Sequence, residues 1–483
     1  MKVDLSRYAA HSYRDSIALE DSIGNKYSFK EVDSVANSFA QRLKEFSISR
    51  GQRISVFSDN TPQEVMLFFA AIKLGAALVV HNIRLRGPEI MREVEKVKPS
   101  LIVTNEYALQ ELQEYSRDLK VPVLELKDIP MQEGESFPSQ GMEMEDTALI
   151  IFTGGSTGEP KGAKLSLRSI IFNSLNTAVT WKLSSSDVSL LAYPFYHTGG
   201  WNVLTLPLYV AGGRTIVIKR FKPEIIADLL ANRGVTVFST VPALLLEITQ
   251  LDDFDAMKFP SLRFVKSGGG MTSQTVVNKF MSKGIKIFQG YGLTEAGPNI
   301  FYSSEEDLNR QSSLGRKTIF CDLKLVDENG RESDEGELCV SGPIIFSGYI
   351  GSEESASAED QVKTGDILRR DSDGFYYFVG RKKFMYKSGG ENIYPTEIES
   401  VLETHPSVSE CAVIGVPDEK WGEVGKAFVV TRERTSEDEL RKFAEKYIAK
   451  YKVPKYFVFV ESIPKTSAGK KDYISLRKGV KND

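Results

Sequence analysis

Apolar positions along the first part of the chain recur with the spacing of helices and strands. Residues 28–46, 64–75 and 167–180 carry apolar side chains at helical spacing, whereas 53–59 and 77–82 are short apolar runs typical of buried strands. Helical and strand segments that alternate in this way predict a mostly parallel sheet with helices on its faces. The expected fold class is therefore mixed α/β.

The pattern changes after residue 314. Residues 314–349 are rich in strand formers, with a hairpin signalled by Asn329-Gly330 and a strand pair over 337–349. Residues 385–483 combine strand-like runs with two amphipathic helices, which predicts a separate α+β module. We therefore expect a large N-terminal domain of several subdomains, with parallel sheets and a β-rich segment, followed by a small C-terminal domain.

Length and composition narrow the class of protein. A chain of 483 residues is too long for one core, and its 41% apolar and 26% charged content is ordinary for a soluble globular protein. The formal net charge of −4 provides no basic field for a nucleic acid. The N-terminus lacks a signal-peptide pattern, and the longest apolar stretch, 65–80, is short for a membrane span. We expect a cytoplasmic protein without a nucleic-acid partner or a membrane span.

Cysteine and histidine residues are few and scattered. Their spacing indicates neither a disulfide framework nor a zinc site, which fits a reducing cytoplasm. The residues are Cys321, Cys339, Cys411, His11, His81, His197 and His405.

A loop rich in Gly, Ser and Thr follows a buried strand at residues 148–162, ALIIFTGGSTGEPKG. Backbone N–H groups and hydroxyls of such a loop can converge on an anion, and Lys161 adds positive charge. It is not a Walker A loop, because Pro160 stands where the motif's lysine would have to follow. The loop is thus a candidate phosphate-binding loop, with an ordinary Gly/Ser turn as the alternative.

Two further turns at strand ends carry residues that could bind a nucleotide. Residues 264–271, FVKSGGGM, place three glycines where a flat ring could lie against bare backbone. Residues 289–295, QGYGLTE, combine an aromatic ring, a hydroxyl and a carboxylate, which can stack on a base, contact a phosphate and hold a hard cation. Taken singly, each turn could also be purely structural.

Together and in this order, the segments resemble the signatures of the adenylate-forming acyl-CoA synthetase superfamily, which includes the AMP-dependent acid–CoA ligases. The resemblance extends from Tyr27 to Lys470 and continues through Thr364-Gly365-Asp366, Gly380-Arg381, the loop 387–395 and Pro464-Lys465-Thr466. It implies an enzyme that uses ATP, Mg²⁺ and coenzyme A. It also implies an N-terminal adenylation domain over 1–380, a hinge at 381–384 and a mobile C-terminal domain over 385–483 that carries Lys470.

The resemblance assigns roles to individual residues. Lys470, Glu295 and Thr294 would be catalytic, and Thr153 with Glu295 would bind Mg²⁺. Tyr291 would pack on adenine, Asp366 would meet the ribose and Thr294 the α-phosphate. The implied ATP- and AMP-binding set is Thr153, Gly154, Gly155, Ser156, Thr157, Gly158, Lys161, Gly268, Gly269, Gly270, Gln289, Gly290, Tyr291, Gly292, Thr294, Asp366 and Arg381.

Three further groups of residues follow from the same resemblance. His197, Gly199 and Trp201 would border the acyl substrate, although a lone His in an apolar context is also typical of a core. Lys383 and Phe384 would form the hinge. The passage for coenzyme A would be lined by Lys387, Ser388, Gly389, Gly390 and Glu391.

The chain departs from the superfamily pattern at three positions. Gly154 stands for the usual Ser of the phosphate loop and removes one hydroxyl. Phe384 replaces the Asp of the hinge, so the hinge loses that carboxylate's polar contacts. Tyr473 replaces an Arg three positions after Lys470.

The expected reaction activates a carboxylic acid as acyl-AMP with release of pyrophosphate and then transfers the acyl group to coenzyme A. Leu204, Leu206 and Leu208 after His197 indicate an apolar acyl pocket. The segment resembles the fatty-acyl members of the superfamily more than the acetate-specific ones, which implies a medium- or long-chain fatty acid. An aryl acid of benzoate or succinylbenzoate type, a carrier-protein acceptor, a luciferase-like oxygenase and a non-catalytic sensor are the alternatives. Small molecules are the expected partners, with a homodimer left open.

Overall fold

The computed structural model describes residues 2–113, 119–129, 131–154, 160–304, 307, 310, 313–352, 356–388, 391–466 and 469–480. They form two compact units, which are described separately below. The first unit comprises Met1–Asp322 and Val340–Val362, and the second comprises Leu323–Cys339 and Lys363–Asp483. The expected mixed α/β class is confirmed, whereas the expected boundary at 381–384 concerns a movement and stays a prediction.

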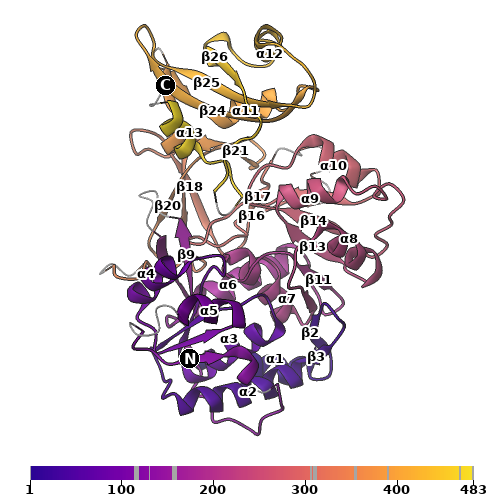
Figure 1. Ribbon diagram of the computed structural model, residues 1–483, viewed down its shortest axis with the longest axis vertical. Coiled ribbons are helices and arrows are strands. Elements are labelled where there is room, and N and C mark those ends of the chain that lie inside the picture. Colours follow the sequence, from indigo (N-terminus) through magenta and orange to yellow (C-terminus); the bar gives the residue numbers. More distant parts are fainter. Residues whose placement is uncertain are drawn as a thin grey trace. The chain divides into compact units, whose positions relative to one another are not determined.

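The first unit contains a six-stranded sheet in the order β10-β9-β5-β4-β6-β7, which is parallel except for the antiparallel β9–β10 hairpin (Figure 1). Its strands are β4 (Arg53–Phe57), β5 (Ala77–Val80), β6 (Leu101–Thr104), β7 (Val123–Glu125), β9 (Thr147–Gly154) and β10 (Pro160–Ser166). The hairpin register pairs Thr153 with Lys161, which brings both ends of the candidate phosphate loop together.

Helices cover this sheet and form the main core with it. The predicted helices over 28–46 and 64–75 are α2 (Phe29–Glu45) and α3 (Pro62–Leu74). Ser28 caps α2 and exchanges hydrogen bonds with Glu31, and α3 ends at Gly75, whose φ of 71° is the left-handed conformation that glycine favours. The other helices around this sheet are α1 (Leu5–Tyr13), α4 (Gly87–Val97) and α5 (Glu106–Gln113).

A seven-stranded sheet in the order β15-β14-β13-β11-β12-β2-β3 completes the first unit, parallel except for the β2–β3 pair. Its strands are β2 (Ile17–Asp21), β3 (Lys26–Ser28), β11 (Val188–Leu191), β12 (Arg214–Val217), β13 (Val237–Thr240), β14 (Phe264–Ser267) and β15 (Lys286–Gln289). Its helices are α7 (Thr205–Ala211), α8 (Pro223–Asn232), α9 (Pro242–Thr249) and α10 (Gln274–Met281). Helix α6 (Leu167–Thr180), which has the predicted bounds, packs on β9 and β10 of the six-stranded sheet and on α7. Two strand pairs are separate: β1 (Lys2–Val3) with β8 (Met142–Glu143), and β16 (Phe301–Tyr302) with β17 (Arg316–Lys317).

The second unit contains two sheets. A four-stranded sheet has the order β18 (Asp322–Val326), β19 (Glu335–Ser341), β20 (Val362–Arg370) and β21 (Tyr376–Arg381). The other combines β22 (Tyr386–Ser388), β23 (Glu391–Ile393), β24 (Val408–Asp418), β25 (Gly422–Thr431) and β26 (Tyr456–Phe459) with the helices α11 (Pro395–Leu402), α12 (Glu437–Ala444) and α13 (Tyr473–Val480).

The strand pair expected over 337–349 is wrong in its second half. Only β19 is a strand there; residues 347–350 instead bond to the outer edge of β10, where Lys164 N–H donates to Gly348 O at 2.9 Å and Ile350 N–H donates to Gly162 O at 2.8 Å. Tyr349 is thereby fixed beside Ala163. Within the described ranges, no helix is both long and apolar enough to cross a bilayer.

Candidate active site

Three segments of the first unit converge on the carboxylate of Glu295. The Thr153 hydroxyl at the end of β9 lies 3.4 Å from Glu295 Oε1, and the Tyr349 hydroxyl donates to the same oxygen at 2.7 Å. Burial, and then the negative charge of Glu295, raises the pKa of Tyr349. Tyr349 therefore stays protonated and holds the carboxylate in place.

Lys161 extends this cluster. It lies opposite Thr153 in the β9–β10 register, and its ammonium is 5.4 Å from the centroid of the Tyr349 ring. Lys161 and Glu295 thus share Tyr349 as a neighbour. Four predicted phosphate-loop residues, Gly155, Ser156, Thr157 and Gly158, lie outside the described residues.

The donors of this cluster fit Mg²⁺ bound together with a nucleotide. A carboxylate and a hydroxyl are the hard oxygen ligands that Mg²⁺ prefers, and protein sites for Mg-nucleotides supply only one or two of them. Among the described residues, no group of three His, Cys, Asp or Glu side chains is placed to hold a metal alone. The remaining ligands would come from phosphate and water.

The predicted adenine strip, Gly268 to Gly270, follows β14 directly. A Cβ added to any of these glycines would meet other atoms only at 3.6 Å or more, which is ordinary van der Waals contact, so the backbone of the strip is not closely covered by its neighbours. Gln289 supports it from behind, because its buried side-chain amide donates to Gly270 O at 2.6 Å. Gln289 is thus a support for the strip.

The segment after Gln289 is shaped by close backbone approaches. A Cβ at Gly292 would lie 2.4 Å from Gly297 O, so this position requires glycine. The half-buried ring of Tyr291 lies 5.5 Å from that of Phe301, and Thr294 is half-buried next to Glu295. Tyr291, Thr294 and Glu295 therefore come from one tight turn.

In the second unit, Asp366 and Arg381 face each other across β20 and β21. Arg381 Nε is 2.7 Å from Asp366 Oδ1, and the carboxylate is almost fully buried while the guanidinium is 43% exposed. Desolvation lowers the pKa of Lys470, as does the charge of Arg381, whereas Asp366 opposes this. The predicted ribose-binding Asp and the predicted catalytic Lys thus lie within electrostatic reach of each other.

The predicted hinge residues Lys383 and Phe384 belong to a 3₁₀ turn over Lys382–Phe384 that follows β21. Burial, and then the charge of Arg381, lowers the pKa of Lys383. The ring of Phe384 packs on that of Tyr473, with centroids 4.6 Å apart. Two departures from the superfamily pattern are thus in contact.

The predicted acyl-site residues differ in accessibility. His197 and Gly199 are half-buried, and a Cβ at Gly199 would meet the Tyr193 ring at 2.9 Å. Trp201 is fully buried: its indole N–H donates to Phe195 O at 2.7 Å and its ring packs against Phe68. Trp201 therefore lies in the core and supports the predicted acyl-site segment from inside.

The predicted coenzyme A passage begins on β22. Lys387 N–H donates to Glu423 Oε2 at 3.3 Å, Ser388 is buried, and Glu391 is exposed at the start of β23. Gly389 and Gly390 lie outside the described residues.

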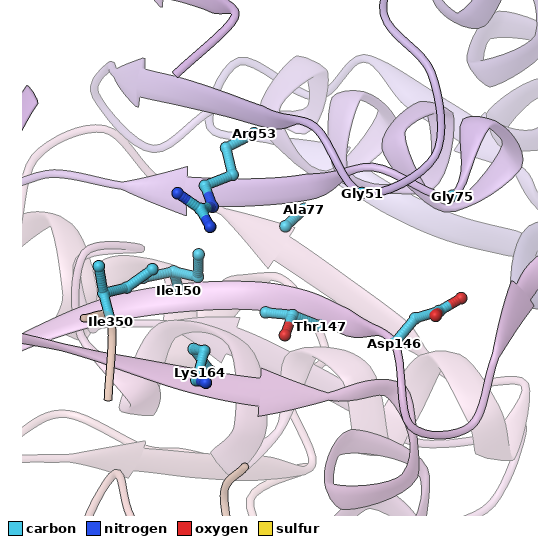
Figure 2. Close-up of a pocket in the computed structure, with 9 residues that line it drawn as sticks. All are labelled: Gly51, Arg53, Gly75, Ala77, Asp146, Thr147, Ile150, Lys164 and Ile350. Carbon is cyan, nitrogen blue, oxygen red and sulfur yellow. The ribbon is translucent and has the colours of Figure 1, made fainter. Parts of the chain in front are cut away.

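A cavity of about 130 Å³ opens elsewhere in the first unit, where β4, β5 and β9 begin (Figure 2). Arg53 and Lys164 line it, and Asp146 at its rim is paired with Arg50 at 2.6 Å. The phosphate loop follows the opposite end of β9, so this cavity is separate from the predicted nucleotide site.

Sequence reasoning missed Tyr349 as a site residue. A Tyr at the end of a strand-like run carries no chemical signal of its own, and only the pairing of residues 347–350 with β10 brings it to Glu295. It also missed Lys266, a buried lysine directly before the adenine strip.

Comparison with known protein families identifies the family of this chain. The model of the AMP-binding enzyme family matches residues 6–350, and that of the AMP-binding enzyme C-terminal domain matches residues 397–470. The chain therefore belongs to the AMP-binding enzyme family, and the resemblance seen in its motifs is confirmed.

Curated relatives cover nearly all of the chain. A feruloyl-CoA synthase from Amycolatopsis is 32% identical over 92% of each protein. A 2-succinylbenzoate–CoA ligase from Bacillus pumilus is 33% identical over 92% of this chain and 91% of that protein. The enzyme class is accordingly that of the AMP-forming acid–CoA ligases.

Solved structures share the fold. ATP-bound MatB from Rhodopseudomonas palustris has a TM-score of 0.91 at 26% identity, with 100% of this chain and 99% of that chain covered. The o-succinylbenzoate CoA synthetase MenE from Bacillus subtilis, in complex with the acyl-adenylate intermediate OSB-AMP, has a TM-score of 0.88 at 27% identity, with 98% of both chains covered. The complex of the same enzyme with ATP and magnesium has a TM-score of 0.88 at 26% identity, with 98% of this chain and 99% of that chain covered. A Mycobacterium tuberculosis fatty acyl CoA synthetase has a TM-score of 0.78 at 28% identity, with 98% of this chain and 97% of that chain covered.

Proposed function

We propose that this AMP-forming acid–CoA ligase activates a carboxylic acid that carries an aromatic ring. Its co-substrates are ATP, used with Mg²⁺, and coenzyme A. The names of the curated relatives, which act on feruloyl and succinylbenzoyl groups, support an aryl acid over the fatty acid favoured by the Leu-rich segment. A fatty acid is the second candidate, because one structural neighbour is a fatty acyl CoA synthetase.

In the first half-reaction, the substrate carboxylate attacks the α-phosphorus of ATP and pyrophosphate leaves, giving acyl-AMP. Negative charge builds up around phosphorus and on the leaving group, so fixed cations and hydroxyl donors lower the barrier. We assign these roles to Lys161, Lys470 and Thr294. Mg²⁺ at Glu295 and Thr153 would neutralise charge on the phosphates.

Nucleotide recognition divides among the other predicted residues. Adenine would lie on Gly268 to Gly270 with Tyr291 packed against it, and the Asp366 carboxylate would accept hydrogen bonds from the ribose hydroxyls. Arg381 orients that carboxylate, because its guanidinium Nε is 2.7 Å from Asp366 Oδ1.

In the second half-reaction, the coenzyme A thiol gives up its proton and attacks the acyl carbonyl, and AMP leaves as the thioester forms. The segment from Lys387 to Glu391 would line the thiol's passage. A rotation at Lys383 and Phe384 would exchange Lys470 for that segment between the two steps. None of the three cysteines is needed as an acyl carrier, and all three are buried.

The observation that carries the adenylation chemistry is the Glu295 carboxylate contacted by the Thr153 and Tyr349 hydroxyls. The ammonium of the phosphate-loop Lys161 lies over the Tyr349 ring. A half-buried carboxylate next to a hydroxyl, with a lysine nearby, suits a magnesium–phosphate complex, and a packed core does not require one.

Pyrophosphate release provides the test. The enzyme, ATP and Mg²⁺ are incubated with hydroxycinnamic acids, benzoic acids, 2-succinylbenzoate and fatty acids of graded length, each with and without coenzyme A. We expect continuous release only with coenzyme A, greatest for one aromatic acid, and formation of the matching acyl-CoA.

Two results would overturn parts of the proposal. A maximum at one fatty-acid length would replace the aryl acid by the second candidate. A single stoichiometric burst that coenzyme A does not change would point to another acceptor. Glu295→Gln, which abolishes the charge and keeps the shape, is the matched control for adventitious ATP hydrolysis.

A further inference from the structure

A lysine is buried directly behind the predicted nucleotide-binding backbone. Lys266, the third residue of β14, is 3% exposed, and its ammonium nitrogen donates to Phe301 O at 3.1 Å. The same nitrogen lies 4.7 Å from the centroid of the Trp181 ring. In the described part of the chain, no carboxylate forms an ion pair with it, and burial is the only influence on its pKa.

Lys266 connects the two segments assigned to adenine. Its own strand continues into Ser267 and the glycine strip, and its Cε would lie 3.2 Å from a Cβ at Gly290, so the side chain passes directly beneath that glycine. Its acceptor, Phe301, packs on the ring of Tyr291, whose carbonyl accepts a hydrogen bond from Ile300 N–H at 3.3 Å. One amine thus holds β14 against the turn that carries Tyr291.

We infer that Lys266 is a positioning residue, which fixes the Gly290–Tyr291 turn against the glycine strip and thereby sets the affinity for the adenine nucleotide. This inference rests on the proposed function, since it assigns the adenine site to these two segments. The amine contacts backbone and rings only, so its effect on the nucleotide passes through the turn.

The charge state of Lys266 gives this role a pH signature. Burial alone lowers the pKa of Lys266 to about 7. When the turn opens and water reaches the amine, Lys266 regains its ordinary pKa of 10.5, so opening takes up a proton between about pH 7 and 10.5. Nucleotide affinity should therefore rise as the pH is raised above about 7, and it should be level below pH 7. The ionisable residues on the surrounding segments are Lys182, Tyr193, Lys286, Tyr291, Glu295, Tyr302, Arg316 and Lys317, the last two on β17 opposite Tyr302 and Phe301.

Lys266→Met tests the inference, because Met has a similar length and neither donor nor charge. We expect the KM for ATP to rise about fivefold, as for the loss of one buried hydrogen bond, with the KM for the acid unchanged. The ratio of wild-type to variant kcat/KM for ATP should fall as the pH is lowered from about 9 to about 7 and should then stay constant down to about pH 6. Isothermal titration with AMP provides a readout that is independent of turnover.

Lys279→Met is the matched control. Lys279 on α10 also donates to a backbone carbonyl, that of Thr249, at 2.7 Å and also lies beside an aromatic ring, 5.8 Å from the centroid of Phe254. It is not part of the nucleotide segments, so its ATP KM should match that of the wild type.

The outcomes separate this inference from the proposed function. If the wild type forms no acyl-CoA from any acid, the proposed function is wrong. The inference is wrong if the Lys266→Met enzyme is active, its KM for ATP lies within about twofold of the wild-type value and its pH profile is unchanged. If the variant fails to fold, hydrogen exchange in the wild type decides. The protection factors of residues 290–302, each taken relative to the intrinsic exchange rate at that pH, should rise between about pH 7 and 9, and protection factors that do not change over this range would overturn the inference.

Discussion

Phe384 and Tyr473 are in ring contact, with centroids 4.6 Å apart and an interplanar angle of 34°. Phe384 stands where the superfamily has a hinge Asp, and Tyr473 stands where it has an Arg. The Tyr473 hydroxyl also donates to Glu399 Oε2 at 2.8 Å, and Arg477 donates to Phe384 O at 3.5 Å. An aromatic contact thus joins two positions that carry opposite charges in the superfamily.

The energy of this contact can be measured with a double-mutant cycle. Phe384→Ala and Tyr473→Ala should be coupled by about 1 kcal/mol, the usual value for an aromatic pair beyond its buried area. Urea unfolding of the full chain gives the four free energies. Phe384→Ala combined with Tyr447→Ala, whose ring is 64% exposed, should be additive. If the unfolding free-energy changes of Phe384→Ala and Tyr473→Ala are also additive, the ring contact contributes nothing to stability.

Lys470→Ala should separate the two half-reactions. Loss of one fixed cation from the charged transition state is expected to slow acyl-AMP formation about 10²- to 10³-fold. Thioester formation from supplied acyl-adenylate and coenzyme A should continue near the wild-type rate. Rapid-quench assays of each half-reaction provide the measurement, with Lys478→Ala on α13 as the control. Equal losses in both steps would contradict the assignment of Lys470 to the first.

Glu295→Gln should change the response to Mg²⁺. The amide keeps the contact with the Tyr349 hydroxyl but loses the charge that a hard cation requires. We expect the Mg²⁺ concentration for half-maximal pyrophosphate release to rise at least tenfold and the maximal rate to fall about 10²-fold. Tyr349→Phe should have a weaker effect, because the carboxylate remains. A Mg²⁺ response that Glu295→Gln leaves intact would place the metal elsewhere.

Local patterns in the sequence predicted most of the fold. The apolar spacing of α2, α3 and α6 and the short runs of β4 and β5 were read correctly, since each of these elements is defined by its own burial pattern. The second strand expected before Tyr349 was wrong. Instead of forming a strand beside β19, residues 347–350 join the edge of β10, a contact between distant segments that no local pattern encodes.

The predicted site divides in the same way, into residues that a sequence motif identifies and residues that only tertiary contacts bring there. Thr153 and Glu295 stand in loops whose residue types indicate phosphate and cation binding, whereas Asp366 and Lys470 were assigned only through the resemblance to the superfamily, and all four roles stay predictions. The residues that hold these groups in place have no such signal, because support for a site comes from whatever side chain the fold brings near. Tyr349 reaches Glu295 and Gln289 reaches Gly270 only through tertiary pairing.

Asp366→Asn should alter the discrimination between nucleotides. If the Asp366 carboxylate binds the ribose diol, the wild type should prefer ATP over 2′-deoxy-ATP and 3′-deoxy-ATP by about tenfold in kcat/KM, as expected for one charge-assisted hydrogen bond. In the variant, the preference should shrink to about twofold or less, mainly through a poorer use of ATP. Pyrophosphate release with each nucleotide measures both ratios. A preference that survives in the variant would assign the ribose contact to another residue.

Glu64 gives a prediction for stability rather than activity. This carboxyl, in the first turn of α3, is 2% exposed, and its Oε2 has no hydrogen-bond partner among the described residues. Burial, and then the charge of Asp59, raises the pKa of Glu64 well above its usual value. The folded chain therefore retains a proton that the unfolded chain has released, and this contribution to stability decreases as the pH rises from about 4.5 towards the raised pKa.

Glu64→Gln removes this dependence, because the amide has similar shape and no charge. A tenfold change in acid dissociation corresponds to about 1.4 kcal/mol. We therefore expect the variant to match the wild type at pH 5 and to be more stable by about 1 kcal/mol or more at pH 8. Thermal unfolding across this range measures the difference, and Glu224→Gln, at an exposed first-turn position of α8, should show no such trend. A variant that loses stability at pH 8 would mean that the charged carboxylate has a partner that stabilises it in the folded chain.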